Sequence, residues 1–440
     1  MPTTTTATGP KKASLGVIFL TLYLDLIGFS IFFPLFPAML EYYLGREGRG
    51  GILGWLLQHI EALAQTWHLN QSYTAVLFAG VIGSLYSLLQ FLFSPIWGAR
   101  SDRVGRRPVL QLTIAGTAAS YAVWALSSSF TLFVVSRIIA GIASGNLSVA
   151  TAAVSDVTSR ENRSRGMGAI GAAFGLGFIT GPALGGIAAH LNLLDRWPGL
   201  AAFGVNPFTV PALIAFGLSL INLVWVRRRF AETYTPGLSA AAAERPRHPL
   251  RALLSLPSAP IRGVIAINAL FVLGFSGLEL TLGFLAVERL AYTPRQLTML
   301  FVFIGVVSTL TQGLLVRRLV PRFGEKASGL SGLSLVCLGM GWLSVAHSPA
   351  SIYGSLALAS IGSGFCYAAL TALLSLYASE DEQGRLMGLY RALGSLARAI
   401  GPVCAGAVYC FFGSTASYAA AAAVLLVPLA LGFALPRPVK

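Results

Sequence analysis

Five charged side chains stand inside long apolar stretches of this 440-residue sequence: Asp25, Arg137, Glu279, Arg391 and Arg398. A carboxylate in such a place can bind and release a proton, because burial favours its neutral form whereas a nearby Arg favours its charged form. A guanidinium group can pair with a carboxylate or bind an anion through two parallel hydrogen bonds. The residue types therefore predict proton coupling at the two acids and anion binding at the three Arg residues.

A short charged loop joins two of the apolar stretches. Residues 98–108 read Gly-Ala-Arg-Ser-Asp-Arg-Val-Gly-Arg-Arg-Pro. We expect Gly98 to allow a close backbone approach, Gly105 to form the turn, and Pro108 to suit the first turn of the next helix. Asp102 is a single carboxylate among four Arg residues, Arg100, Arg103, Arg106 and Arg107. This arrangement indicates a specific role for the acid.

The composition predicts which elements position these residues. The chain is 55% hydrophobic and 11% charged, with a mean hydropathy of +0.72, whereas soluble domains carry about 25% charged residues. Runs of about 20 apolar residues predict twelve transmembrane helices. The pattern Arg-x-Met-Gly, Gly-Pro and Gly in residues 165–186 recurs in residues 385–406. The sequence thus predicts an all-α membrane protein with two pseudo-symmetric six-helix halves.

The predicted domain organisation follows from these runs. It comprises a disordered N-terminal tail (1–13), an N-terminal six-helix bundle (14–227), a cytoplasmic linker (228–262), a C-terminal six-helix bundle (263–435) and a C-terminal tail (436–440). An amphipathic helix is expected in the long loop 45–70, lying in the membrane interface. Asn70 begins a glycosylation sequon at the edge of that loop.

The net charge of +15 comes with an uneven distribution of positive residues. Of the 31 Lys and Arg residues, 23 fall on the side of the predicted termini and 5 on the other. This asymmetry follows the positive-inside rule with both termini cytoplasmic, so we infer a bilayer and no nucleic-acid partner. The four Cys and five His residues show no metal-ligand spacing. No nucleophile–base pair or phosphate-binding loop is visible, so we expect no cofactor, no metal and no enzyme activity.

The charged loop resembles the signature loop of the major facilitator superfamily. One position departs from the pattern, because Arg100 replaces an apolar residue. The resemblance implies that Asp102 caps a helix of the opposite half and that Arg106 pairs with Asp156, the acid after the fourth span. The residues expected to form this conformational gate are Gly98, Asp102, Arg103, Gly105, Arg106, Arg107 and Asp156.

Other segments resemble the drug:proton antiporter branch of that superfamily. Asp25 is followed by Gly28, Pro34 and Pro37, as in bacterial tetracycline exporters, and Arg137 begins an element with small residues at four-residue spacing. The fifth span carries the branch's packing motif at Gly177, Gly181, Pro182, Gly185 and Gly186. Small residues at such spacing let helix backbones approach closely.

These features imply a secondary active transporter of small organic solutes that works by alternating access with proton coupling. Three intramembrane Arg residues against two acids favour an organic anion, such as an acidic drug, as the substrate. An animal subgroup that the sequence also resembles suggests the same substrates and a place in the plasma membrane, or alternatively in the nuclear envelope or endomembranes. The alternatives are an exporter of cationic or zwitterionic drugs such as tetracycline, and a receptor or scaffold that has lost transport. We expect a monomer.

Helix depth predicts two ion pairs. At 1.5 Å per residue, Glu279 and Arg398 reach similar depths from the cytoplasmic side, and so do Asp25 and Arg137. We therefore expect the pairs Glu279–Arg398 and Asp25–Arg137, with Arg398 contacting the substrate anion when Glu279 releases it. Arg391, nearer the cytoplasm, is expected to affect entry more than affinity.

The charge asymmetry makes a testable prediction about orientation. An epitope tag in the linker 228–262 should require permeabilisation of the cell for antibody access, whereas a tag in the loop 45–70 should not, for protein in the plasma membrane. A linker tag stained in intact cells would overturn this topology.

Overall fold

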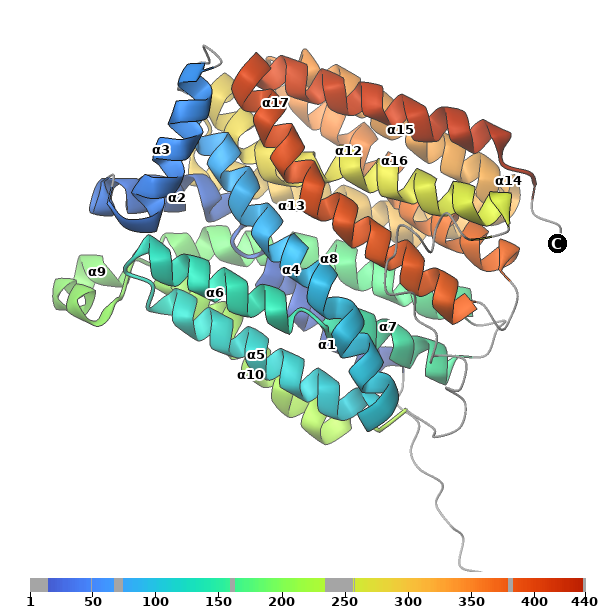
Figure 1. Ribbon diagram of the computed structural model, residues 1–440, viewed down its shortest axis with the longest axis horizontal. Helices are drawn as coiled ribbons and strands as arrows, with labels where there is room; N and C mark the ends of the chain where they lie inside the picture. Colours follow the sequence, from blue (N-terminus) through green and yellow to red (C-terminus); the bar gives the residue numbers. More distant parts are fainter. Residues whose placement is uncertain are drawn as a thin grey trace, which may run out of the picture.

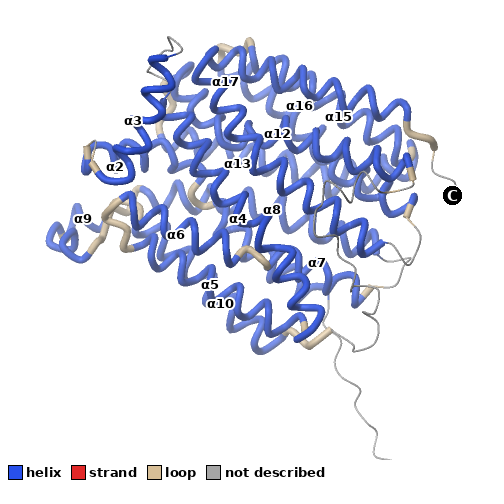
Figure 2. Tube along the Cα trace, viewed as in Figure 1, coloured by secondary structure: helices blue, strands red, loops and turns tan. Residues whose placement is uncertain are grey.

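The computed structural model describes residues 15–48, 50–66, 74–158, 163–233, 256, 258–378 and 383–437. These residues form helices and connecting loops, with no strand among them (Figure 2). The sequon at Asn70, most of the linker 228–262 and the predicted N-terminal tail lie outside this part of the chain.

Two bundles of long, roughly parallel helices lie against each other (Figure 1). The first contains α1 (Leu15–Ser30), η1 (Phe33–Leu35), α2 (Phe36–Glu47), α3 (Gly51–Thr66), α4 (Thr74–Val104), α5 (Arg106–Ala125), α6 (Phe130–Ala143), α7 (Asn146–Val157), α8 (Arg163–Ala189), α9 (Leu193–Arg196), η3 (Pro198–Phe203) and α10 (Thr209–Arg229). The second contains α12 (Ala259–Leu290), α13 (Pro294–Leu310), η5 (Thr311–Val316), α14 (Arg317–Phe323), α15 (Glu325–Ser344), α16 (Pro349–Tyr377) and α17 (Gln383–Ala434).

The described helices account for twelve crossings of a membrane. Nine are long and apolar enough by composition, and the last of these, within α17, holds two crossings separated at Gly413, which has φ +82°. The helices α4 and α5 complete the set. In α5 the polar Thr117 and Ser120 donate hydrogen bonds to carbonyls of the preceding turn. Their polar groups are therefore satisfied inside the helix, as a bilayer requires.

Several crossings are broken where the sequence predicts one continuous helix. The first changes at Phe33–Leu35 into a 3₁₀ turn around Pro34 and then continues as α2 to Glu47. The fourth breaks between α6 and α7 at Gly145, where a β-carbon would lie 2.6 Å from Cβ of Trp97. The eighth contains the π-helical turn η5. Beyond each break, the depth of a side chain in the membrane no longer follows from counting residues along one continuous helix.

The connection between α4 and α5 is shorter than the sequence suggests. The expected loop from Gly98 to Pro108 is helical as far as Val104, and Gly105 alone separates the two helices. Gly105 has φ +102°, a conformation that side chains with a β-carbon rarely adopt. The buried Ser101 stabilises the last turn of α4 by donating a hydrogen bond to the carbonyl of Gly98.

The packing motif of α8 brings this helix against α1. A β-carbon at Gly185 would lie 2.0 Å from the carbonyl oxygen of Ile31, and one at Gly181 would lie 2.0 Å from Oγ of Ser30. Ser30 also donates a hydrogen bond to the carbonyl of Gly177, at 2.9 Å. The glycines thus allow direct backbone contact between the helices.

The second half repeats this contact. A β-carbon at Gly401 of α17 would lie 2.1 Å from Oγ of Ser276 and 2.7 Å from the carbonyl oxygen of Leu273 in α12. At Gly181 the corresponding distances are 2.0 Å to Ser30 and 2.7 Å to the carbonyl oxygen of Ile27. The repeat seen in the sequence is therefore also a repeat in the packing.

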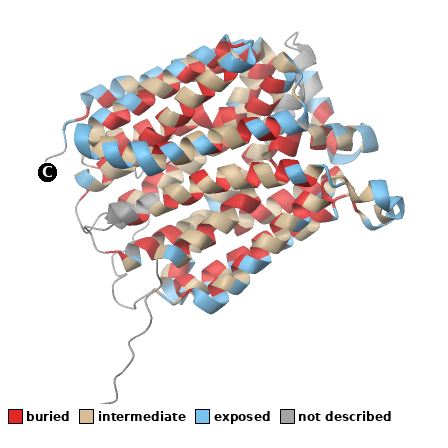
Figure 3. Ribbon diagram, turned by 180° about the vertical axis from the view of Figure 1, so that it is seen from behind, coloured by how far each residue is buried: buried red, intermediate tan, exposed pale blue. Residues whose placement is uncertain are grey.

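The two halves share a hydrophobic cluster near α2 and α3. We call it the shared cluster: it joins Phe32, Phe36, Ile82 and other side chains of the first half to Leu280, Phe284 and Cys410 of the second. At the opposite end, where Gly105 lies, the cluster around Ile18 and Val109 contains residues of the first half alone. Buried residues run through the middle of the molecule, and exposed ones gather on its outside and ends (Figure 3).

The contact between α1 and α8 predicts a large effect of one methyl group. Gly185→Ala should lower the unfolding free energy by about 1–3 kcal/mol, because the added carbon meets a backbone carbonyl that has no room to move. Gly217→Ala in α10 is the matched control, since no atom lies within 4 Å of its β-carbon position. Thermal unfolding in detergent should show a lower midpoint for the first variant only; equal midpoints would contradict the contact.

Candidate functional site

A cavity lies between the two halves, next to the shared cluster. Both halves contribute to its lining: Phe29, Phe32, Phe33, Phe36, Ile82, Gly83, Tyr86, Ser87 and Arg137 from the first, and Ser276, Glu279, Leu280, Arg398 and Pro402 from the second. Its volume is about 50 Å³, room for only a few water molecules. An organic ligand therefore requires the halves to move apart.

Glu279 and Arg398 form an ion pair on one side of this cavity. Nη1 of Arg398 lies 2.8 Å from Oε2 of Glu279, and its Nη2 donates to Oη of Tyr367 at 3.1 Å. Both charged side chains are 23% exposed. The pair predicted from helix depth is therefore present, and Tyr367 of α16 holds the guanidinium group in place.

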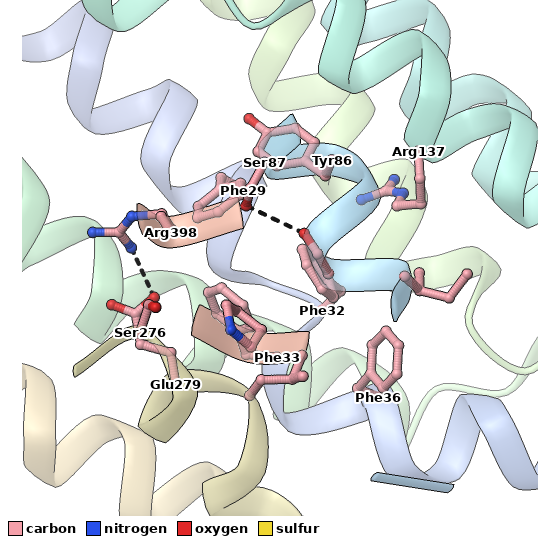
Figure 4. Close-up of a pocket in the computed structure, with 14 residues that line it drawn as sticks. Phe29, Phe32, Phe33, Phe36, Tyr86, Ser87, Arg137, Ser276, Glu279 and Arg398 are labelled. Atoms are coloured by element: carbon pink, nitrogen blue, oxygen red, sulfur yellow. Dashed lines mark hydrogen bonds and ion pairs between the residues drawn. The ribbon is translucent and has the colours of Figure 1, made fainter. Parts of the chain in front are cut away.

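Arg137 lies on the other side of the aromatic side chains (Figure 4). It is 4% exposed. Its guanidinium carbon lies 5.3 Å from the ring centroids of Phe32 and Trp124, 5.4 Å from Phe133 and 6.0 Å from Tyr121. Such contacts attract a cation to the face of the ring, but they do not neutralise it. Within the described residues Nη2 of Arg137 has no hydrogen-bond partner.

The predicted pair Asp25–Arg137 is wrong. Asp25 instead accepts a hydrogen bond at 2.7 Å from Nδ2 of Asn146, whose own oxygen accepts one from Thr113. Arg137 lies in α6, whereas Asn146 begins α7 on the other side of the break at Gly145. The level of Asp25 is therefore that of Asn146, and Arg137 lies closer to the α3 end.

Arg391 occupies a different level from the cavity. It lies two helical turns before Arg398 in α17, so both side chains leave the same face of the helix. Arg391 is partly buried and does not line the cavity. The structure thus separates it from Arg398 and Arg137.

The gate residues expected at the start of α5 do meet. Arg106 donates to Asp156 at 2.9 Å, to Ser101 at 2.7 Å and to Asp102. Burial disfavours its charge, but the hydrogen bonds and charges of Asp156 and Asp102 outweigh burial and raise the pKa of Arg106. Arg106 therefore stays charged and joins α4, α5 and α7.

The expected contact of Asp102 with the opposite half stays a prediction. The helices α4 and α17 pack along each other, but the start of α17 adjoins residues 379–382, which lie outside the described part of the chain.

Sequence reasoning missed one part of this network, the residues that follow α10. Glu232 accepts hydrogen bonds from the backbone N–H groups of Arg106 at 2.8 Å and Arg107 at 3.1 Å. A β-carbon at Gly105 would lie 2.5 Å from its Oε2. Thr233 donates to Asp156 at 3.0 Å. A carboxylate at a helix N-terminus satisfies unpaired N–H groups and interacts favourably with the helix dipole.

Among the described residues, no group of three or more His, Cys, Asp or Glu side chains is placed to hold a metal ion. The Cys residues at 337, 366, 404 and 410 are free thiols. The chemistry of the cavity therefore rests on the two Arg residues, one acid and aromatic rings.

Comparison with known proteins gives a family. The family model described as "Major Facilitator Superfamily" matches residues 18–402 and 322–440. The mouse protein named "Major facilitator superfamily domain-containing protein 10" is 36% identical over 96% of this chain and 93% of its own length. The class C tetracycline resistance protein of Escherichia coli is 29% identical over 91% and 90%.

Comparison with solved structures also finds membrane transporters. The crystal structure of the human organic anion transporter MFSD10 (TETRAN) superposes with a TM-score of 0.78 and 34% identity, covering 95% of this chain and 98% of that one. A bacterial homolog of the human lysosomal transporter Spinster, inward-facing and occupied, gives 0.66 at 13% identity, over 97% and 96%. The second likeness bears on the fold alone.

The network around Arg106 makes a prediction. Arg106→Lys keeps the charge but cannot reach Ser101, Asp102 and Asp156 together, so transport should slow several-fold, with a lower thermal midpoint. Arg228→Lys, at an exposed position near the end of α10 and outside the expected gate, is the control and should behave as the unmodified protein. Equal flux and stability of both variants would remove Arg106 from the gate.

Proposed function

Because the chain belongs to the major facilitator superfamily, a family of multi-pass membrane transporters rather than enzymes, we propose that it carries small organic anions by alternating access. Two of its relatives suggest different substrates: the human protein MFSD10 is an organic anion transporter, whereas the class C relative from Escherichia coli is a tetracycline resistance protein. The charges in the cavity favour the anion.

The observation that carries the proposal is the uncompensated guanidinium group of Arg137. The cavity holds two positive side chains and one negative one, and the negative one is committed to Arg398. An anion bound at Arg137 satisfies its unpartnered Nη2 and neutralises a charge that the aromatic rings only shield. A cation in the same place meets a net positive cavity with no free carboxylate, which disfavours a cationic drug.

The other residues that line the cavity suggest the chemistry of the rest of the substrate molecule. Four Phe residues, Tyr86 and Leu280 surround the space between Arg137 and Arg398. Such a surface binds an apolar or aromatic group through its area and through ring contacts. We therefore infer a substrate with one anionic group and an aromatic or apolar body.

The sequence favoured Arg398 as the residue that contacts the anion, whereas the contacts of the two Arg residues support Arg137 for this role. Because Arg398 already forms an ion pair with Glu279, an anion that binds to Arg398 has to displace this carboxylate. Arg137 instead has a hydrogen-bond donor, Nη2, without a partner among the described residues. We therefore assign the anchor to Arg137 in the first half and a supporting role to Arg398 in the second. Contact with both halves couples binding to their relative movement.

The packing supports a proposal for the route across the membrane. The shared cluster covers the cavity on the α3 side, so we propose that the substrate enters when the halves move apart on the side of Gly105. We propose that both termini and Gly105 face the cytoplasm, that the plasma membrane is the site of action, and that Asp102, Arg106 and Asp156 form the gate.

The anchor makes a direct prediction for the purified protein. The probe is 1-naphthalenesulfonate, an aromatic anion. Arg137→Gln should weaken its binding about tenfold to a hundredfold, the cost of a charged hydrogen bond of about 1.5–3 kcal/mol. Thermal stability of the empty protein should not fall, because the change removes an unpaired buried charge.

Two further variants complete this test. Arg398→Lys should reduce affinity less than Arg137→Gln, because the pair with Glu279 persists. Arg391→Gln, outside the cavity, should leave affinity unchanged. Unchanged affinity in Arg137→Gln would remove it as the anchor, and no saturable binding by the unmodified protein would overturn the proposed function.

A further inference from the structure

Six polar or charged side chains line the cavity between the two halves. The proposed function uses the three charged ones. The three neutral ones carry hydroxyl groups, and each hydroxyl can donate one hydrogen bond to a ligand unless the protein already uses it. These three residues are Ser87, Ser276 and Tyr86.

The two Ser hydroxyls are already used within their own helices. Oγ of Ser87 donates to the carbonyl of Gly83 at 3.2 Å. Oγ of Ser276 donates to the carbonyl of Leu273 at 3.5 Å. It also lies against α17, because a β-carbon at Gly401 would be 2.1 Å from it. Bonds of this kind to the preceding turn satisfy a Ser hydroxyl inside a membrane helix, so we expect neither Ser to donate to a ligand.

The hydroxyl of Tyr86 differs from them. In the part of the chain that the structure describes, its Oη has no hydrogen-bond partner, and it is not fully buried. The ring packs on Phe29 with centroids 5.2 Å apart, and Phe29 packs edge-on against Phe33 at 5.4 Å. These contacts fix the direction of the Tyr86 ring, and Figure 4 shows its hydroxyl on the side away from Arg137. Because a Tyr hydroxyl inside a protein usually finds a partner, this one can serve an acceptor that arrives with a ligand.

We propose that Tyr86 determines which aromatic anions the site prefers, because its hydroxyl donates a hydrogen bond to an acceptor atom in the body of the substrate. This inference rests on the proposed function and adds a second polar group to the substrate. That group is a carbonyl, an ether or a ring nitrogen, and it lies at a distance from the anionic group. Arg137 binds the charge, the Phe rings bind the apolar surface, and Tyr86 recognises the acceptor.

The selectivity follows from what happens to the hydroxyl when a ligand enters. The empty cavity, about 50 Å³ in volume, has room for a few water molecules that can bond to it. A ligand that displaces this water without offering an acceptor leaves the hydroxyl unpaired, which weakens binding. A ligand with an acceptor in the right place keeps the bond. A site with such a donor therefore discriminates against analogues that lack the acceptor.

The two polar contacts of the substrate both belong to the first half. Arg137 lies in α6 and Tyr86 in α4. These helices touch one turn after Arg137, where a β-carbon at Gly141 would lie 3.2 Å from the carbonyl oxygen of Tyr86. When the two halves move apart as rigid units, the distance between Arg137 and Tyr86 stays the same. The same substrate shape is therefore recognised in every state of the transport cycle, whereas contacts with the second half change.

The experiment measures binding to the full-length protein in detergent. The reference ligand is 1-naphthalenesulfonate. The test ligands are quinoline and isoquinoline sulfonates, in which a nitrogen replaces one ring carbon at different positions, at a pH where this nitrogen is unprotonated. All of them have the same shape and the same single negative charge. For at least one isomer, affinity relative to the reference should fall about threefold to tenfold in Tyr86→Phe, the loss of one neutral hydrogen bond.

Two features make this comparison specific. The cost of removing the ring nitrogen from water is the same for both proteins, so it cancels when the ratio for the variant is divided by the ratio for the unmodified protein. Tyr353→Phe is the matched control: Tyr353 of α16 lies outside the cavity and packs edge-on against Phe303 at 4.9 Å. This variant loses the same hydroxyl group and should keep the preference of the unmodified protein.

Three results would overturn the inference. They are equal losses of affinity for the reference and every isomer in Tyr86→Phe, a changed preference in Tyr353→Phe, and isomers that all bind the unmodified protein with one affinity whatever the position of the nitrogen. The last result needs no variant, so a poorly folded Tyr86→Phe protein does not prevent the test. Absence of saturable binding of 1-naphthalenesulfonate would instead contradict the proposed function itself.

Discussion

The central constraint on this protein is the cost of an unpaired charge inside a membrane. Arg137 is 4% exposed, and it forms no ion pair with any residue that the structure describes. The rings of Phe32, Trp124 and Phe133 surround the guanidinium group and attract it without neutralising it. Ordinary membrane proteins pair or exclude such a charge. Here the charge lines a cavity to which both halves contribute.

Positions along a helix could be predicted from the sequence, but breaks in helices could not. Counting residues placed Glu279 and Arg398 at one level because α12 and the first part of α17 are continuous between the membrane edge and these residues. The same count failed for Asp25 and Arg137. It could not supply Asn146 as the partner of Asp25, since an amide 121 residues away leaves no local pattern.

The network around Arg106 also contains contacts that could not be predicted from the sequence. Arg106 and Asp156 could be expected from the family motif, because the motif records both residues. Glu232 could not, because it follows a run of three Arg residues and looks like an ordinary linker residue. Its role depends on a backbone conformation, φ +102° at Gly105, that brings two N–H groups within 3.1 Å of one carboxylate. Backbone geometry of this kind appears only when the chain is folded.

The matching contacts of Gly181 with Ser30 and of Gly401 with Ser276 have an evolutionary meaning. A contact repeated within each half is expected when one six-helix unit has been duplicated. Two identical copies of such a unit carry every charge twice. Once the two copies belong to one chain, each can change separately. One half can then hold Arg137 without an ion pair, while the other pairs Glu279 with Arg398. The two halves thus share their helix packing but differ in how their buried charges are paired.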